Sequence, residues 1–273
     1  MNRKMKYAFM LALLLILSDA FMAVKLAEQN IKLEHSNPDK SSVSEVSSRN
    51  STAPVVTKQY RTDGVVAEYP MLVTGGSVEQ LKQWNQIIEE DVDKILAIYS
   101  FQPVPGPART PSESQATILR IKYEMKLNNE NYVSIFYTAA FNSPTSAHPT
   151  QLVYTTNIDK AASKRMVLSD IVILNEEFVR NFRTWEYIPL VENNEEWNNA
   201  VKDYVTNISD EELLSGFQNA DIIGSKNRWN IYSYLTKDRL GISLGVPNFI
   251  GDHAEFEEKY QKIKNYLRPD FKY

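Results

Sequence analysis

The pentapeptide Gly241-Ile242-Ser243-Leu244-Gly245 has the G-x-S-x-G spacing of a nucleophilic serine held on a sharp strand-to-helix turn. Such a serine carries out acyl transfer only together with an acid and a histidine that follow it in the chain. The only downstream histidine is His253, which stands directly beside Asp252, and Pro247 prevents a helix from starting. We therefore expect Ser243 to be an ordinary serine on the polar, solvent-facing side of a strand.

A metal centre is not expected from the three histidines, His35, His148 and His253. No two of them have the spacing of ligands on one helix, and the chain has no cysteine to supply a thiolate. The sequence also lacks a glycine-rich phosphate loop and a calcium-loop pattern. We predict a protein without metal or cofactor and without a catalytic constellation, and so not an enzyme.

The segment Ser146-Ala147-His148-Pro149 lies in a loop, 142–149, between two predicted strands. A histidine locked by a proline and flanked by small residues can present its imidazole rigidly. Two interpretations stay open from the residues alone: a loop with a structural role, or a loop whose His148 contacts a ligand. The tyrosines and tryptophans leave a similar choice between core packing and a stacking surface for sugar rings or a partner.

The net charge of the chain argues against some classes of binding partner. The formal net charge of -4 gives no electrostatic footprint for nucleic acid, and it argues against general adhesion to an anionic membrane or polymer. Any such contact would need a local patch of cations.

Because the chain has no cysteine, its stability must come from an ordinary hydrophobic core. The content of hydrophobic residues, 43%, is sufficient for such a core.

Residues 1–24 have the pattern of a signal peptide or a membrane anchor. Arg3, Lys4 and Lys6 precede an apolar run over 7–17, and Ser18-Asp19-Ala20 supplies small residues at the positions that a signal peptidase reads. Serine and charged residues dominate 25–54, which predicts a disordered tether. We expect residues 55–273 to work outside the cytoplasm, either anchored through the N-terminal segment or secreted after its cleavage.

Apolar residues at helical spacing predict a long helix that opens with a capping box formed by Ser77 and Gln80. The stripe that faces the core consists of Leu81, Trp84, Ile88, Val92, Ile95 and Tyr99. Glu89, Glu90 and Asp91 fall where the solvated face of this helix is expected. We interpret them as exposed charges and not as an acid–base pair.

Alternation with a period of two over 119–127, a turn at 128–131 and renewed alternation from Val133 predict an antiparallel hairpin. Further strands are expected over 151–156, 165–168, 229–235 and 240–246. Helices are expected after the caps Asn175 and Ser209, around Trp197, and at the end through Phe256, Tyr260, Ile263 and Leu267. This order predicts an α+β fold with an antiparallel sheet and packed helices, as a single globular unit or two closely packed subdomains.

An ordered series of short motifs resembles a known exported module. The series runs through Val133-Ser134-Ile135, Ala147-His148-Pro149, Asn157-Ile158-Asp159 and Met166-Val167-Leu168-Ser169-Asp170-Ile171. It is similar to the extracytoplasmic domain of the lysozyme-sensing anti-sigma-V factors (RsiV) and to the non-catalytic N-terminal region of the peptidoglycan deacetylase PdaC. Tyr69-Pro70-Met71-Leu72, Tyr234-Leu235-Thr236-Lys237-Asp238 and Lys264-Asn265-Tyr266-Leu267 extend the resemblance over roughly 55–267.

The resemblance implies an extracytoplasmic α+β binding module for a cell-envelope ligand, either a lysozyme-like protein or peptidoglycan. Only six residues precede the apolar segment, so an anti-sigma factor is not expected. The expected ligand-binding residues are Asn142, Ser146, His148, Tyr154 and Asp159. Two alternatives stay open: an envelope hydrolase that uses Ser243 or His148, and a structural scaffold that holds another envelope protein through its sheet edge.

Overall fold

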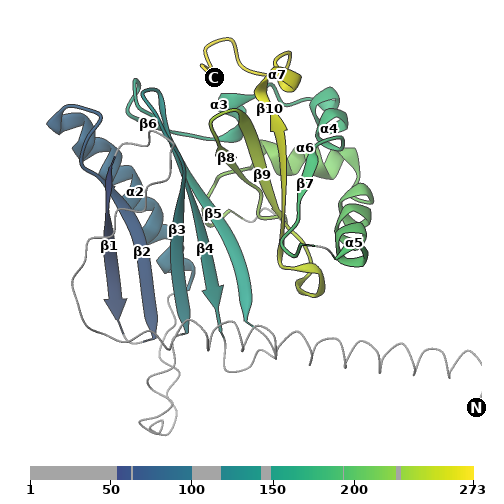
Figure 1. Cartoon of the computed structure of the whole chain (residues 1–273), viewed down its shortest axis with the longest axis horizontal. Helices are drawn as coiled ribbons and strands as arrows, with labels where there is room; N and C mark the ends of the chain where they lie inside the picture. The colour runs from purple at the N-terminus through teal and green to yellow at the C-terminus, as the bar shows by residue number, and fades with distance from the viewer. Residues whose placement is uncertain (1–53, 63, 100–117, 143–148, 193, 226–228) are drawn as a thin grey trace, which may run out of the picture. The chain divides into compact units, whose positions relative to one another are not determined.

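The computed structural model describes residues 54–62, 64–99, 118–142, 149–192, 194–225 and 229–273. Every described residue belongs to one compact unit, Asn50–Tyr273. Among the described residues, no helix is both long enough and apolar enough to cross a membrane. The predicted α+β class is confirmed, because helices accompany two mostly antiparallel sheets (Figure 1).

The larger sheet has six strands in the order β1-β2-β3-β4-β5-β6. All neighbouring strands are antiparallel except β2 and β3, which run parallel. Consecutive parallel strands need a crossover connection, and α2 lies in the segment between them. The bounds are Val55–Thr62 for β1, Val65–Leu72 for β2, Leu119–Asn128 for β3, Tyr132–Phe141 for β4, Thr150–Asp159 for β5 and Lys164–Met166 for β6.

Helix α2, Val78–Ile98, confirms the predicted capping box: Ser77 accepts from the backbone N–H of Gln80, and the Gln80 side chain accepts from the backbone N–H of Ser77. Its apolar stripe packs on one face of the larger sheet (Figure 1), where Trp84 and Ile88 share a core cluster with Ile121 of β3. The predicted β3–β4 hairpin is also present, with a bulge between Met125 and Leu127.

The smaller sheet has four strands in the order β7-β10-β9-β8, all antiparallel. The bounds are Glu186–Ile188 for β7, Tyr232–Leu235 for β8, Arg239–Gly245 for β9 and His253–Lys259 for β10. The predicted closing helix is wrong over its first part: Phe256 lies in β10, and α7 covers only Tyr260–Ile263. Ala254 and Phe256 alternate with Glu255 and Glu257, a period of two that suits a strand.

The smaller sheet packs with one face on β4 and β5, and the other face is covered by helices (Figure 1). The Phe136 ring of β4 meets the Tyr234 ring of β8 edge-on, with centroids 5.3 Å apart, while Phe182 of α4 contacts Phe256 of β10. The layers are therefore α2, larger sheet, smaller sheet and outer helices. The remaining helices are α3 (Leu168–Ile171), α4 (Glu176–Phe182), α5 (Glu195–Thr206), α6 (Asp210–Gln218) and the 3-10 turn η1 (Asn248–Ile250).

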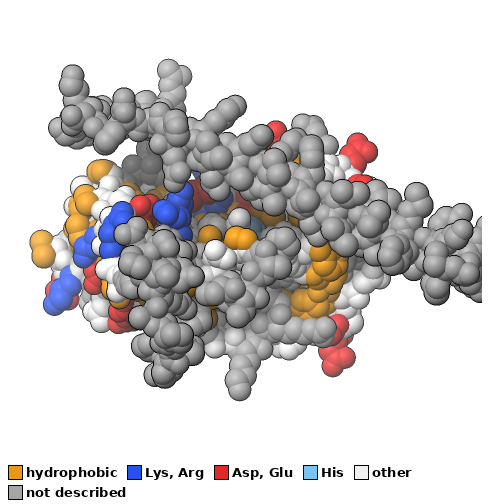
Figure 2. All heavy atoms as spheres, turned by 90° about the horizontal axis from the view of Figure 1, so that it is seen from below, with side chains coloured by type: hydrophobic (Ala, Val, Ile, Leu, Met, Phe, Trp, Pro, Cys, Tyr) orange, Lys and Arg blue, Asp and Glu red, His pale blue; other side chains and the backbone are white. Residues whose placement is uncertain are grey.

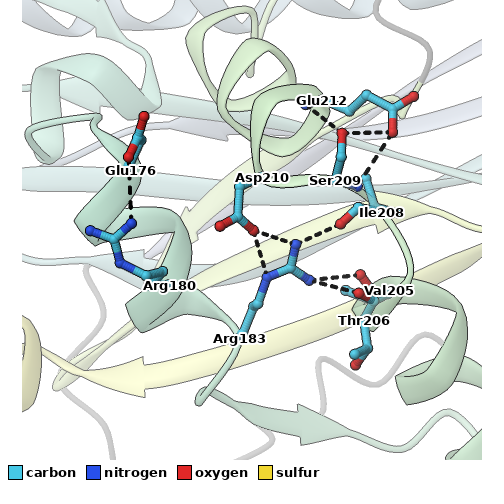
Figure 3. A network of polar contacts seen from close by, with 9 residues as sticks. All are labelled: Glu176, Arg180, Arg183, Val205, Thr206, Ile208, Ser209, Asp210 and Glu212. Atoms are coloured by element: carbon cyan, nitrogen blue, oxygen red, sulfur yellow. Dashed lines mark hydrogen bonds and ion pairs between the residues drawn. The ribbon is translucent and has the colours of Figure 1, made fainter.

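One arginine connects three of the outer helices (Figure 3). Arg183 follows α4, and its guanidinium donates to the carbonyls of Val205 and Ile208 at 3.1 and 2.5 Å. The same group donates to Asp210 Oδ1 through Nε at 2.9 Å and through Nη2 at 2.6 Å. Carbonyls at a helix C-terminus lack partners within the helix. Arg183 therefore satisfies the end of α5 and fixes the start of α6.

Candidate functional site

Asp91 of α2 is buried, with 1% of its surface exposed. The prediction that it lies with Glu89 and Glu90 on the solvated face is wrong for Asp91. It stands three residues after Ile88 and four before Ile95, which places it on the same buried stripe. The spacing was visible in the sequence, but the acidic neighbours favoured the solvated interpretation.

The Asp91 carboxylate has protein donors at both oxygens. Thr156 of β5 donates to Oδ2 at 2.7 Å, and Arg165 of β6 and Lys94 of α2 donate to Oδ1. Burial raises the pKa of Asp91, and the positive charge of Arg165 opposes that rise. Arg165 also donates to the carbonyl of Thr155 at 3.2 Å, so its guanidinium connects the backbone of β5 with Asp91 of α2.

Asp221 is a second buried carboxylate, in the segment between α6 and β8, and its φ is +64°. Oδ1 accepts from the Ser233 backbone N–H at 2.6 Å and from the Thr155 hydroxyl at 3.3 Å. Oδ2 accepts from the Leu168 backbone N–H and the Ser233 hydroxyl, each at 2.7 Å. Burial raises the pKa of Asp221 to about 6, although these hydrogen bonds and Arg165 favour the ionised form.

We call Asp91, Thr155, Arg165, Asp221 and Ser233 the polar seam. Two carboxylates with raised pKa values beside one guanidinium are a combination found at active sites. Both carboxylates, however, are only 1% exposed, and their oxygens are taken by protein donors. The polar seam therefore joins α2, the edge of β5 and β8 internally, and it presents no accessible acid or base.

Ser243 lies in the middle of β9, which pairs with β8 on one side and β10 on the other. The expectation of a solvent-facing serine is wrong: Ser243 is 1% exposed, because both faces of this central strand are covered. Its hydroxyl has no hydrogen-bond partner among the described residues. The expectation that it is not on a strand-to-helix turn is confirmed, since β9 continues to Gly245.

Polar residues do gather around Ser243 on this face of the smaller sheet. Glu255 stands opposite Ser243 in the register, and its Oε1 is 3.6 Å from Nε2 of His253. The Tyr234 hydroxyl lies 3.0 Å from a carboxylate oxygen of both Glu255 and Glu257. Burial raises the pKa of Tyr234, which keeps the phenol protonated as a donor.

Lys126 of β3 supplies the compensating charge for this group. Its ammonium lies 5.1 Å from the centre of the Tyr234 ring and 4.9 Å from that of Phe136. Burial opposes ionisation of Glu255, but the hydrogen bond from His253 and the charge of Lys126 prevail and lower the pKa of Glu255. The arrangement is a polar contact between the two sheets in which Lys126 also pairs with Glu124 at 2.8 Å, and the serine and the histidine are both buried.

The predicted ligand-binding residues are not brought together. Asn142 is exposed just beyond β4, where its backbone N–H donates to the carbonyl of Ile118 at 2.8 Å. Asp159 ends β5 at the opposite end of the β4–β5 pair, opposite Tyr132, and its Oδ1 accepts from the backbone N–H of Ala162 at 2.9 Å. A ten-residue pair spans roughly 30 Å, so Asn142 and Asp159 do not share a small ligand.

Tyr154 of β5 belongs to the interior. It is 5% exposed, its hydroxyl is 3.0 Å from that of Tyr99, and its ring meets the Tyr232 ring edge-on. Ser146 and His148 lie outside the described residues. Of the five predicted residues, the structure therefore describes three: Asn142 is exposed, Tyr154 is buried, and the carboxylate of Asp159 stabilises a turn.

An exposed group of cations lies on the larger sheet, on the face opposite α2. Arg61 of β1 stands opposite Val66 of β2, and Val66 stands opposite Arg120 of β3, so these side chains share one row across three strands. Lys122 follows two residues after Arg120 and points to the same side. All three cations are exposed. We call Arg61, Arg120 and Lys122 the basic patch.

The sequence showed only part of the basic patch. The alternation over 119–127 correctly placed Arg120 and Lys122 on the polar face of their strand. Arg61 was missed because no strand was predicted over Val55–Thr62, where only Val55 and Lys58 are partly buried. Figure 2 shows Lys and Arg side chains gathered on the side of the molecule that β1 and β2 occupy.

No protein-family model and no curated protein matches this sequence. Several solved structures are similar to it, including two from the DUF3298 family. A DUF3298 family protein from Pseudomonas aeruginosa PAO1 has a TM-score of 0.43 and 12% identity, over 79% of this chain and 94% of that chain. A DUF3298 family member from Bacteroides fragilis NCTC 9343 has a TM-score of 0.40 and 14% identity, over 80% and 96%. At these values neither neighbour assigns a family or a function to this chain.

Proposed function

We propose that this protein is a non-catalytic binding module that recognises a ligand of the cell envelope, either a lysozyme-like protein or peptidoglycan. It would be exported and either anchored by its N-terminal segment or secreted. The ordered motifs that resemble the RsiV and PdaC modules support this assignment, and so does the position of the reactive groups. Ser243, His253, Asp91 and Asp221 are all buried, so a substrate cannot reach them.

The observation that carries the proposal is the contrast between this closed interior and the exposed cations of β1 and β3, which lie on the face opposite α2, beside the part of β4 and β5 that the smaller sheet covers. On that face Arg61, Arg120 and Lys122 are exposed and rest on rigid strands. Exposed charged side chains on a rigid scaffold are suited to recognition, because they lose little conformational freedom of the backbone on binding.

The test is a pull-down with the full chain, solubilised in mild detergent. Immobilised lysozyme and insoluble peptidoglycan are offered separately, and heat-denatured protein serves as the control. We expect saturable capture on one of the two. Capture on neither, or labelling of Ser243 by a serine-hydrolase probe, would contradict a non-catalytic envelope-binding role.

A second candidate function is a scaffold for another envelope protein, and the edge strand β1 favours it. β1 ends the strand order of the larger sheet, and among the described strands it pairs only with β2. Such an edge offers unpaired backbone groups to which an extended segment of a partner can add as a further strand. Replacing Gln59 by proline in the middle of β1 would weaken this mode of binding. Because Gln59 also accepts from Arg61, Arg61→Ala serves as the control that leaves the backbone of the edge strand intact.

A further inference from the structure

Hydrogen bonds orient the Arg61 guanidinium of the basic patch and leave its two terminal nitrogens, Nη1 and Nη2, available. Arg61 Nε donates to Gln59 Oε1 at 2.8 Å, and Gln59 Nε2 donates to Glu68 Oε1 at 3.1 Å. This chain fixes the guanidinium through Nε. Among the described residues, Nη1 and Nη2 of Arg61 have no hydrogen-bond partner.

The remaining charges on this face do not cancel the patch. Glu124 is paired with Lys126 at 2.8 Å, and Glu68 is the carboxylate that orients Arg61 through Gln59. Arg120 and Lys122 make no ion pair with any described residue. Even when Glu124 is counted in full, because Lys126 also serves the Glu255 group, the three cations face two carboxylates, Glu68 and Glu124. A local surplus of positive charge therefore remains on a protein whose net charge is -4.

The side-chain types and their spacing indicate the ligand chemistry. Arginine binds planar carboxylates through two parallel hydrogen bonds, which lysine cannot do. Arg61 and Arg120 stand on strands separated by one strand, so their Cα atoms are about 10 Å apart. This spacing suits a polymer that displays carboxylates at intervals, and a cationic protein ligand would be repelled.

We infer that the basic patch binds the carboxylates of peptidoglycan stem peptides. This inference rests on the proposed function and chooses between its two ligands. Arg61 and Arg120 each take one carboxylate, and Lys122 adds attraction without fixed geometry.

The experiment is co-sedimentation of the full chain with purified peptidoglycan, together with lysozyme beads as the second arm. The variant Arg61→Ala/Arg120→Ala/Lys122→Ala is compared with Lys82→Ala/Lys164→Ala/Lys264→Ala, which removes three exposed cations elsewhere. We expect the patch variant to lose at least tenfold in affinity for peptidoglycan, with an unchanged melting temperature, and the matched control to bind like the wild type. Soluble poly-L-glutamate should compete with peptidoglycan, and added salt should weaken binding because these charges are exposed.

The substitution Arg61→Lys/Arg120→Lys keeps the charge but removes the paired hydrogen bonds, and we expect an intermediate loss of affinity. If the wild type binds peptidoglycan and the patch variant binds equally well, the inference fails while the proposed function stands. Capture by lysozyme alone also overturns the inference and leaves the function. Binding to neither ligand overturns both.

Discussion

The Tyr234 ring lies directly against the backbone of Gly241: a Cβ added to Gly241 would stand 2.1 Å from Cζ of Tyr234. Gly241 is the first glycine of the G-x-S-x-G pattern. Because glycine has no side chain, the Tyr234 ring can pack against this position between the two sheets, where it also meets the Phe136 ring. The motif thus has a structural explanation that needs no nucleophile.

Replacing Gly241 by alanine should destabilise the protein by about 1–3 kcal/mol, because the methyl group overlaps the Tyr234 ring. A double-mutant cycle with Tyr234→Ala isolates the contact. Chemical denaturation should show that Gly241→Ala costs much less once the ring has been removed. Equal costs in both backgrounds would show that the overlap is relieved elsewhere.

Ser243→Ala should leave the free energy of unfolding unchanged or raise it by up to about 1 kcal/mol. The buried hydroxyl has no partner among the described residues, so its removal abolishes a desolvation cost and breaks no hydrogen bond. Thermal melting of the purified protein measures the effect. A drop of several degrees would reveal a partner for this hydroxyl.

Arg183→Ala should cost about 2–4 kcal/mol, because it leaves the carbonyls of Val205 and Ile208 and the carboxylate of Asp210 without their donor. Arg180→Ala is the matched control. Within the described part of the chain Arg180 makes one polar side-chain contact, an exposed one of 3.5 Å with Glu176, and its loss should stay within about 0.5 kcal/mol. Urea titrations of both variants test the difference, and similar midpoints would refute the role of Arg183.

The contribution of Asp221 to stability should fall as the pH rises from about 4 to about 6. Asp221 has its pKa raised from 3.8 to about 6 by burial, so between these values the folded state holds a proton that the unfolded state has released. Stability contributed by this proton is present below the unfolded pKa and is lost as the pH passes the folded one. The loss is on the order of 3 kcal/mol.

Asp91, whose pKa is also raised by burial, acts in the same direction. Asp221→Asn should therefore reduce the slope between pH 4 and 6 without abolishing it, while lowering stability throughout, since an amide nitrogen cannot accept the donors that surround Asp221. Unfolding curves over this pH range provide the measurement. An identical slope in the variant would assign the titration to another group.

Elements with strong local signals could be predicted from the sequence. The capping boxes at Ser77 and Ser209 and the Asn175 cap mark the start of helices whose apolar stripes are long or well spaced. The β3–β4 hairpin was equally clear, since one of its strands alternates strictly between charged and apolar residues. In these cases the local sequence preference and the tertiary packing agree.

The errors arose where tertiary packing reverses a local signal. Ser243 alternates with apolar residues as on a half-exposed strand, but β9 is central and covered on both sides. Phe256 and Tyr260 are spaced for a helix, yet pairing with β9 and β7 makes the first of them part of a strand. Asp91 can lie on the buried stripe of α2 because Arg165, distant in the sequence, pairs with its carboxylate from another element.

The candidate site was less predictable than the fold. The basic patch depends on the register between β1, β2 and β3, and β1 is mostly exposed and carries no apolar alternation. A row across three strands is invisible until the pairing is known. The sequence could supply the residue types but not their neighbours.

Asp221 also has a consequence for how the chain is made. A polypeptide leaves the ribosome from its N-terminus, so α2 and all six strands of the larger sheet emerge before the carboxylate that accepts from Thr155 and Leu168. Ser233, whose amide and hydroxyl bind the same carboxylate, follows later still. An incomplete chain would hold its larger sheet with the Thr155 hydroxyl and the Leu168 amide unsatisfied. The hydrogen bonds of Asp221 can therefore form only after Ser233 has been synthesised, so the polar contact between the two sheets is completed late.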